Sequence, residues 1–109
     1  MKTYTVVIEA GAERDLLEID AYIAGHDSAE KAISVMAKIE QVIGKLETFP
    51  NRGSRPKELV ENGVLDFRET LFKPYRILYR VVEDKVVVVL VADGRRDMRA
   101  LLARRLLGA

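Results

Sequence analysis

The chain has 109 residues, 49% of them hydrophobic and 32% charged, a composition typical of one globular domain spanning residues 1–109. The absence of cysteine excludes disulfides, thiolate catalysis and cysteine-ligated metal sites. No apolar run reaches the roughly 18–20 residues that a membrane helix needs, and the N-terminus lacks a signal-peptide pattern. We therefore expect a cytoplasmic protein without membrane contact.

The formal net charge of +1 conceals an uneven distribution. Residues 1–50 carry 5 basic and 9 acidic side chains, whereas residues 51–109 carry 13 basic and 8 acidic ones. An electropositive C-terminal half indicates either an acidic partner or a basic face that only keeps the surface solvated.

The N-terminal half predicts one strand and two helices. Residues 3–9 are rich in β-branched side chains, which favour a strand. Apolar residues then recur at helical spacing over residues 12–23 and again over residues 27–46. Between them, Asp27 is the expected N-cap of the second helix, and Glu30 would complete a capping box. The short connection predicts an antiparallel helical hairpin.

The C-terminal half predicts a loop, three strands and a helix. "FPNRGSRP" is typical of a loop, and "KELVENG" of one helical turn closed by Gly63. Alternating apolar residues then predict an antiparallel meander of strands, and a helix follows; their ranges are 64–71, 75–82, 86–92 and 97–107. The strand over 86–92 is apolar on both faces, so we expect it in mid-sheet with cover on each side. The predicted fold class is α+β in the order β-αα-βββ-α: a helical hairpin packed on a small curved antiparallel sheet, with a C-terminal helix.

The usual catalytic devices are missing from the sequence. The glycines are too scattered for a phosphate-binding loop, and the one histidine, His26, lies in the turn between the helices. Cysteines and a second histidine are lacking for a metal site. We therefore predict no catalytic residue, no metal and no cofactor. The carboxylates of the first helix are expected to form its solvated face: Glu13, Asp15, Glu18 and Asp20.

The main signal is a set of arginines. Arg76 and Arg80 alternate with apolar residues on one strand, and Arg68 is expected to join them on a basic sheet face. Arg95 and Arg96 follow the end of the last strand. Arginine makes bidentate contacts with phosphate or carboxylate, so these residues could line one electropositive surface. The alternative is that Arg76 and Arg80 form structural ion pairs.

Several stretches resemble the RelE/ParE superfamily of bacterial type II toxin–antitoxin toxins, particularly its ParE branch. They are "LETFPNRGSRPKEL", "DFRETLFKPYRILYRV" and "VVLVADGRRDMRALL", together with "AERDLLEIDAYIA" and "DSAEKA" near the N-terminus. The similarity covers nearly the whole chain. The fold that this resemblance implies has the same order of elements that the periodicity predicts.

The resemblance leaves two mechanisms open. RelE-type members are ribonucleases that cut messenger RNA on the ribosome, and they need groups that transfer protons beside their cations. Residues 94–109 offer no Tyr, His, Lys or Glu, and Met98 stands where those nucleases tend to carry an aromatic residue or a histidine. Tyr75, Tyr79, Lys57 and Lys73 remain as acid–base groups.

ParE-type members instead bind DNA gyrase and block replication, which requires a rigid surface and no catalytic pair. We therefore favour a non-enzymatic gyrase inhibitor that does not bind DNA directly. The expected target-binding residues are Arg95, Arg96 and Arg99, with Arg104 and Arg105 secondary. A toxin-fold relic that only binds its antitoxin is a third hypothesis.

The resemblance also implies a cognate ParD-like antitoxin that forms a hetero-oligomer with the toxin. A segment of such a partner could lie against the two N-terminal helices. The expected contacts are apolar residues outside the main helical stripes, namely Leu17, Tyr22 and Ile33. The alternative is that these residues belong to a wider core face.

Overall fold

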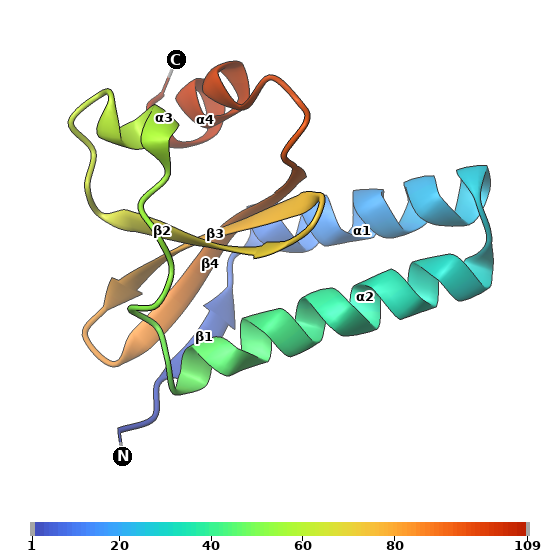
Figure 1. The fold of residues 1–109 in the computed structure, drawn as a ribbon, viewed down its shortest axis with the longest axis horizontal. Helices are drawn as coiled ribbons and strands as arrows, with labels where there is room; N and C mark the ends of the chain where they lie inside the picture. The colour runs from blue at the N-terminus through green and yellow to red at the C-terminus, as the bar shows by residue number, and fades with distance from the viewer. Residues whose placement is uncertain (1, 109) are drawn as a thin grey trace.

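The computed structural model describes residues 2–108 (Figure 1). Two long helices follow the first strand, and a short helix precedes the remaining three strands and the last helix. In chain order the elements are β1 (Thr5–Ile8), α1 (Ala10–His26), α2 (Ala29–Gly44), the 3₁₀ turn η1 (Lys45–Glu47), α3 (Lys57–Val60), β2 (Phe67–Phe72), β3 (Tyr75–Val82), β4 (Lys85–Asp93) and α4 (Met98–Leu106). This order confirms the predicted fold class, including the helical turn that precedes Gly63, whose φ is +74°.

The four strands form one sheet in the order β1-β4-β3-β2. β2, β3 and β4 form the expected antiparallel meander. β1 pairs with β4 in parallel, so the sheet is mixed and not wholly antiparallel. The helical hairpin and α3 carry the chain from β1, at one edge of the sheet, to β2 at the other edge, and the meander then brings β4 back beside β1.

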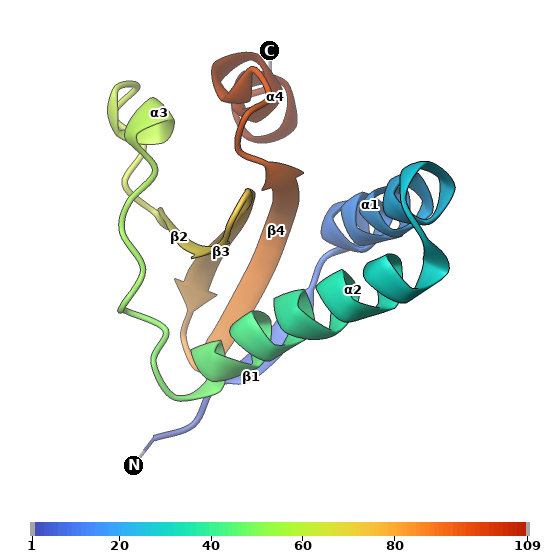
Figure 2. The same cartoon turned by 45° about the vertical axis from the view of Figure 1, so that its right-hand side comes forward.

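Helices cover the sheet on both faces (Figure 2). The α1–α2 hairpin packs against one face through Ile77 and Tyr79 of β3. The helices α3 and α4 pack against the opposite face, where Leu78 of the same strand meets Leu59 and Met98. β4 lies between β1 and β3 and is buried over most of its length. The prediction of a mid-sheet strand with cover on each side is therefore confirmed.

The break between the first two helices differs from the prediction. α1 continues to His26, and the Asp27 N–H bonds to the Ile23 carbonyl, so Asp27 ends this helix. Ser28 is the N-cap of α2 because its hydroxyl accepts a hydrogen bond from the Lys31 N–H at 3.0 Å. The prediction of Asp27 as N-cap, with a capping box to Glu30, was therefore wrong by one residue.

The loop between α2 and α3 is tied to the sheet by Tyr79. This side chain is fully buried, and its hydroxyl donates to the Pro50 carbonyl at 2.6 Å. Nearby, Gly53 approaches β2 so closely that an added Cβ would lie 2.4 Å from the Glu69 carbonyl oxygen. Only glycine fits at this contact.

Substitution Tyr79→Phe tests this anchor. It leaves the buried Pro50 carbonyl without its partner, so we expect the free energy of unfolding to fall by about 1–2 kcal/mol. Chemical denaturation measures the change. In the matched control, Tyr22→Phe at an exposed ring, stability should stay within about 0.5 kcal/mol. Equal stability of both variants would show that the Tyr79 hydroxyl does not anchor the loop.

Candidate functional site

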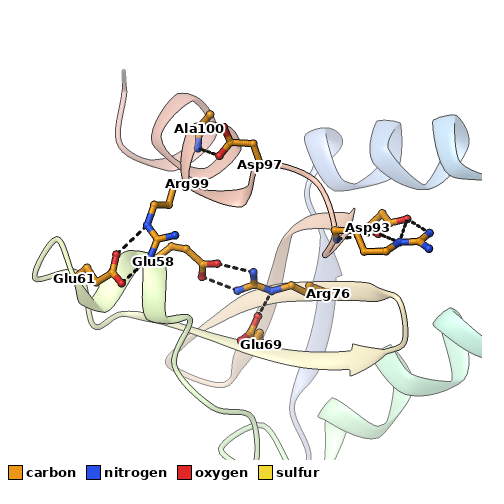
Figure 3. Close-up of polar contacts among 9 residues, drawn as sticks. Glu58, Glu61, Glu69, Arg76, Asp93, Asp97, Arg99 and Ala100 are labelled. Carbon is orange, nitrogen blue, oxygen red and sulfur yellow. Dashed lines mark hydrogen bonds and ion pairs between the residues drawn. The ribbon is translucent and has the colours of Figure 1, made fainter.

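The arginine-rich segment connects β4 to α4. β4 ends at Asp93, and α4 begins at Met98, whose inward side chain is buried. Asp97 caps α4, since its carboxylate accepts a hydrogen bond from the Ala100 N–H at 3.1 Å (Figure 3). The connecting residues Arg95 and Arg96 are exposed. A buried strand and a capped helix therefore hold two guanidinium groups at the surface.

Arg95 and Arg99 form surface ion pairs. Arg95 contacts Asp93 at 2.6 Å while its side chain remains 78% exposed, and Arg99 contacts Glu61 of the turn after α3 at 2.8 Å. The hydrogen bond from Arg95 lowers the pKa of Asp93. Exposed ion pairs contribute little to stability, so both guanidinium groups can exchange their partner for another carboxylate.

Arg105 has a structural position. Its guanidinium makes a bidentate contact with Asp15 of α1 at 2.9 and 3.0 Å, and the Asp15 side chain is only 12% exposed. Asp15 also accepts the Val91 N–H at 3.0 Å, which joins α1, β4 and α4. Gly11 leaves the necessary space, since a Cβ there would lie 2.9 Å from Arg105 Nη2. The prediction that Asp15 belongs to a solvated face was therefore wrong.

Arg96 and Arg104 differ from the other three arginines. Both are exposed, and within residues 2–108 neither has an ion-pair partner. The five predicted target-binding arginines thus divide into two without such a partner, two in weak surface pairs and one that joins three elements.

The predicted basic sheet face does not form. Arg68 lies opposite Tyr79 in the β2–β3 register, so it shares the Tyr79 face and donates to the Gly53 carbonyl at 2.8 Å. Arg76 and Arg80 point to the other face, as their spacing predicted. Grouping Arg68 with them was wrong because the register shifts its side chain to the opposite face.

Arg76 forms ion pairs with carboxylates inside the protein. It makes a bidentate contact with Glu58 of α3, both distances 2.8 Å, and contacts Glu69 of β2 at 2.7 Å (Figure 3). Glu58 is 6% exposed. Hydrogen bonding from Arg76 lowers the pKa of Glu58 to about 2, and the two carboxylates raise the pKa of Arg76. The alternative of structural ion pairs therefore holds for Arg76, while Arg80 remains exposed.

The three predicted antitoxin contacts are all exposed. Leu17 and Tyr22 on α1 are 68% and 64% exposed, and Ile33 on α2 is 69% exposed. The Tyr22 ring stacks on His26 with ring centroids 4.0 Å apart. These residues do not belong to the core, so the hairpin presents apolar side chains to solvent.

A groove of about 410 Å³ runs between α1 and the end of β4. Tyr22 and Tyr75 line it together with Arg95 and Arg96. Burial, helped by Asp93, raises the pKa of Tyr75. Tyr75 is partly buried: it packs against the core and also lines this groove.

Of the other acid–base candidates, Tyr79 is buried, and burial raises its pKa. Lys57 and Lys73 are exposed and lie outside this groove. Among residues 2–108, no group of three or more His, Cys, Asp or Glu side chains is arranged to hold a metal ion. In the same part of the chain, no helix combines the length and apolar character needed to cross a membrane.

The Glu58–Arg76 pair predicts a pH dependence of stability. A carboxyl whose pKa falls from 4.5 to about 2 on folding stabilises the protein above pH 4.5 and loses that effect as the pH drops toward 2. This shift corresponds to about 3 kcal/mol.

Substitution Glu58→Gln should remove this part of the pH dependence. It should also cost about 3 kcal/mol at pH 7, because Arg76 then keeps only Glu69 as a charged partner. Urea denaturation between pH 7 and pH 3 measures both effects. The same acid profile in both proteins would show that another carboxyl is responsible.

Sequence and structure comparisons place these features in a known group. The chain is 28% identical to Toxin ParE3 of Caulobacter vibrioides over 91 residues, which cover 84% of this chain and 87% of that toxin. A solved chromosomal ParDE toxin–antitoxin system from P. aeruginosa has the same fold, with a TM-score of 0.71, 20% identity, and coverage of 84% of this chain and 96% of the other.

Two RelE-type structures are also similar. The toxin–antitoxin complex RelBE2 from Mycobacterium tuberculosis gives a TM-score of 0.59 at 25% identity, covering 85% of this chain and 93% of its own. An E. coli toxin RelE variant in the free state gives 0.63 at 13% identity, covering 95% and 98%. The fold alone therefore does not separate the two branches.

The family model decides between the branches. Residues 6–98 match the model described as ParE toxin of type II toxin–antitoxin system, parDE, so the match runs from the second residue of β1 to the first residue of α4. The chain belongs to the ParE toxin family of type II toxin–antitoxin systems.

Proposed function

We propose that this ParE-family toxin inhibits DNA gyrase by binding it, and that the arginines of the β4–α4 segment make the contact. The observation that carries the proposal is the exposure of the arginines in this segment and on α4. Arg95, Arg96, Arg99 and Arg104 are all exposed. Bidentate guanidinium groups on a rigid strand end and helix suit tight binding of a protein surface.

The state of Tyr75 supports a binding role over catalysis. Tyr75 lines one groove together with Tyr22, Arg95 and Arg96. Its raised pKa keeps the phenol protonated at neutral pH, so it is a poor base for a ribose hydroxyl. A nuclease of the RelE type would need such a base beside its cations.

A ParD-like antitoxin is the proposed partner, and Leu17, Tyr22 and Ile33 are its proposed contacts. Two structural neighbours are a ParDE toxin–antitoxin system and a RelBE2 toxin–antitoxin complex. Exposed apolar side chains on a helical hairpin favour an amphipathic segment as the occupant. The complex would be a cytoplasmic hetero-oligomer.

A RelE-like messenger ribonuclease is the second candidate. It is favoured by the place of Tyr75 beside two arginines, because a protonated phenol can still act as a general acid. It is also favoured by the similarity in fold to the RelE-type structures.

Inducing the chain in a bacterium that lacks the antitoxin separates these functions. We expect filamentation with DNA-damage signalling, and inhibition of supercoiling when purified chain is added to purified gyrase. Arrested translation with cleaved messenger RNA, abolished by Tyr75→Phe, would establish the ribonuclease instead. Normal growth at a confirmed level of folded protein would contradict both and support an antitoxin-binding relic.

The double substitution Arg95→Ala/Arg96→Ala should reduce gyrase inhibition by at least tenfold, because it removes two exposed cations without touching the core. The matched control is Lys38→Ala/Lys85→Ala, which removes two exposed charges from α2 and from the start of β4. Full toxicity of the arginine variant, with an unchanged circular dichroism spectrum, would show that the contact lies elsewhere.

A further inference from the structure

A second, smaller cleft lies between α1 and α4, with a volume of about 230 Å³. α1 contributes Arg14 and Glu18, the connecting segment contributes Arg96, and α4 contributes Leu101 and Arg104. The Asp15–Arg105 ion pair forms the remaining charged part of the lining. Segments that are distant in the sequence thus bring four guanidinium groups to one cleft.

The charges in this cleft do not balance. Arg105 is neutralised by Asp15 at 2.9 Å. Arg14, Arg96 and Arg104 are exposed and have no ion-pair partner within residues 2–108. Glu18 is the one other carboxylate in the lining. Three like charges around one small cleft repel one another, and a bound anion would relieve that repulsion.

We infer that this cleft binds a carboxylate side chain from an acidic segment of the toxin's protein target. The inference rests on the proposed function and narrows it. Arg96 and Arg104 become the specific contact, together with Arg14, which no sequence motif indicates. Arg105 is then occupied by Asp15, and Arg99 does not line the cleft.

The lining favours a protein segment over nucleic acid. Glu18 would repel a continuous phosphate backbone but can accept a hydrogen bond from a peptide N–H or a lysine. Leu101 adds an apolar surface that suits a side chain. The chain's net charge is only +1, whereas binding to the phosphate backbone draws on a strongly basic surface.

The first test uses the purified full chain and two fluorescent probes at low salt. One is an alternating Glu–Ala peptide, and the other is an oligothymidylate of equal charge. We expect the peptide to bind more tightly, with an affinity that falls as salt rises. Arg14→Ala/Arg104→Ala should weaken peptide binding by at least tenfold, while the control Lys38→Ala/Lys85→Ala should stay within twofold. Tighter binding of the oligothymidylate, or undiminished binding by the arginine variant, would overturn the inference.

The second test separates the cleft from the proposed function. The same variants are added to purified gyrase, and supercoiling is measured. If Arg14→Ala/Arg104→Ala no longer inhibits gyrase while Lys38→Ala/Lys85→Ala still does, the result supports target binding at the cleft. Equal inhibition by this variant and the unaltered chain would contradict target binding at the cleft, while gyrase would remain the target. If the unaltered chain fails to inhibit gyrase, the proposed target is wrong, and peptide binding still decides whether the cleft takes an acidic segment.

Discussion

The constraint on which this fold depends is a central strand that is apolar on both faces. β4 cannot expose either face without a large cost in hydrophobic free energy, so each face needs helices. One face receives the α1–α2 hairpin, and the other receives α3 and α4. The strand also brings its own end, with the arginine segment that follows, to the position where α1 and α4 approach each other. The core thereby fixes where the charged surface lies.

Ion pairs then divide the arginines by role. Arg76 and Arg105 lie in partly buried bidentate pairs that join helices to the sheet and to each other. Removing one member of such a pair leaves a charge without its partner, so the role of these arginines is to stabilise the fold. Arg96 and Arg104 have no ion-pair partner within the described residues, and such exposed charges are available to a binding partner. A count of arginines in the sequence does not reveal this division.

The surface also separates two kinds of contact. Apolar side chains on the hairpin, such as Leu17 and Ile33, are suited to an amphipathic partner segment. The guanidinium groups around α4 are suited to carboxylates. Tyr22 and Arg95 line the same groove, so the two surfaces meet there. A partner bound at Tyr22 would therefore lie within reach of an arginine proposed for the target.

The sequence by itself determined the order of elements, the mid-sheet position of β4 and the exposure of Arg95 and Arg96. Each follows from local periodicity, or from a run of apolar residues, that tertiary contacts did not override. The N-cap of α2 is Ser28, one residue after the predicted Asp27, since both are good caps and the neighbouring geometry selects between them. Only the tertiary structure decided the face of Arg68, the burial of Glu58 against Arg76, the role of Asp15 and the meeting of Arg14 with Arg104. These depend on strand register and on helices far apart in the sequence, and no local pattern encodes such distances.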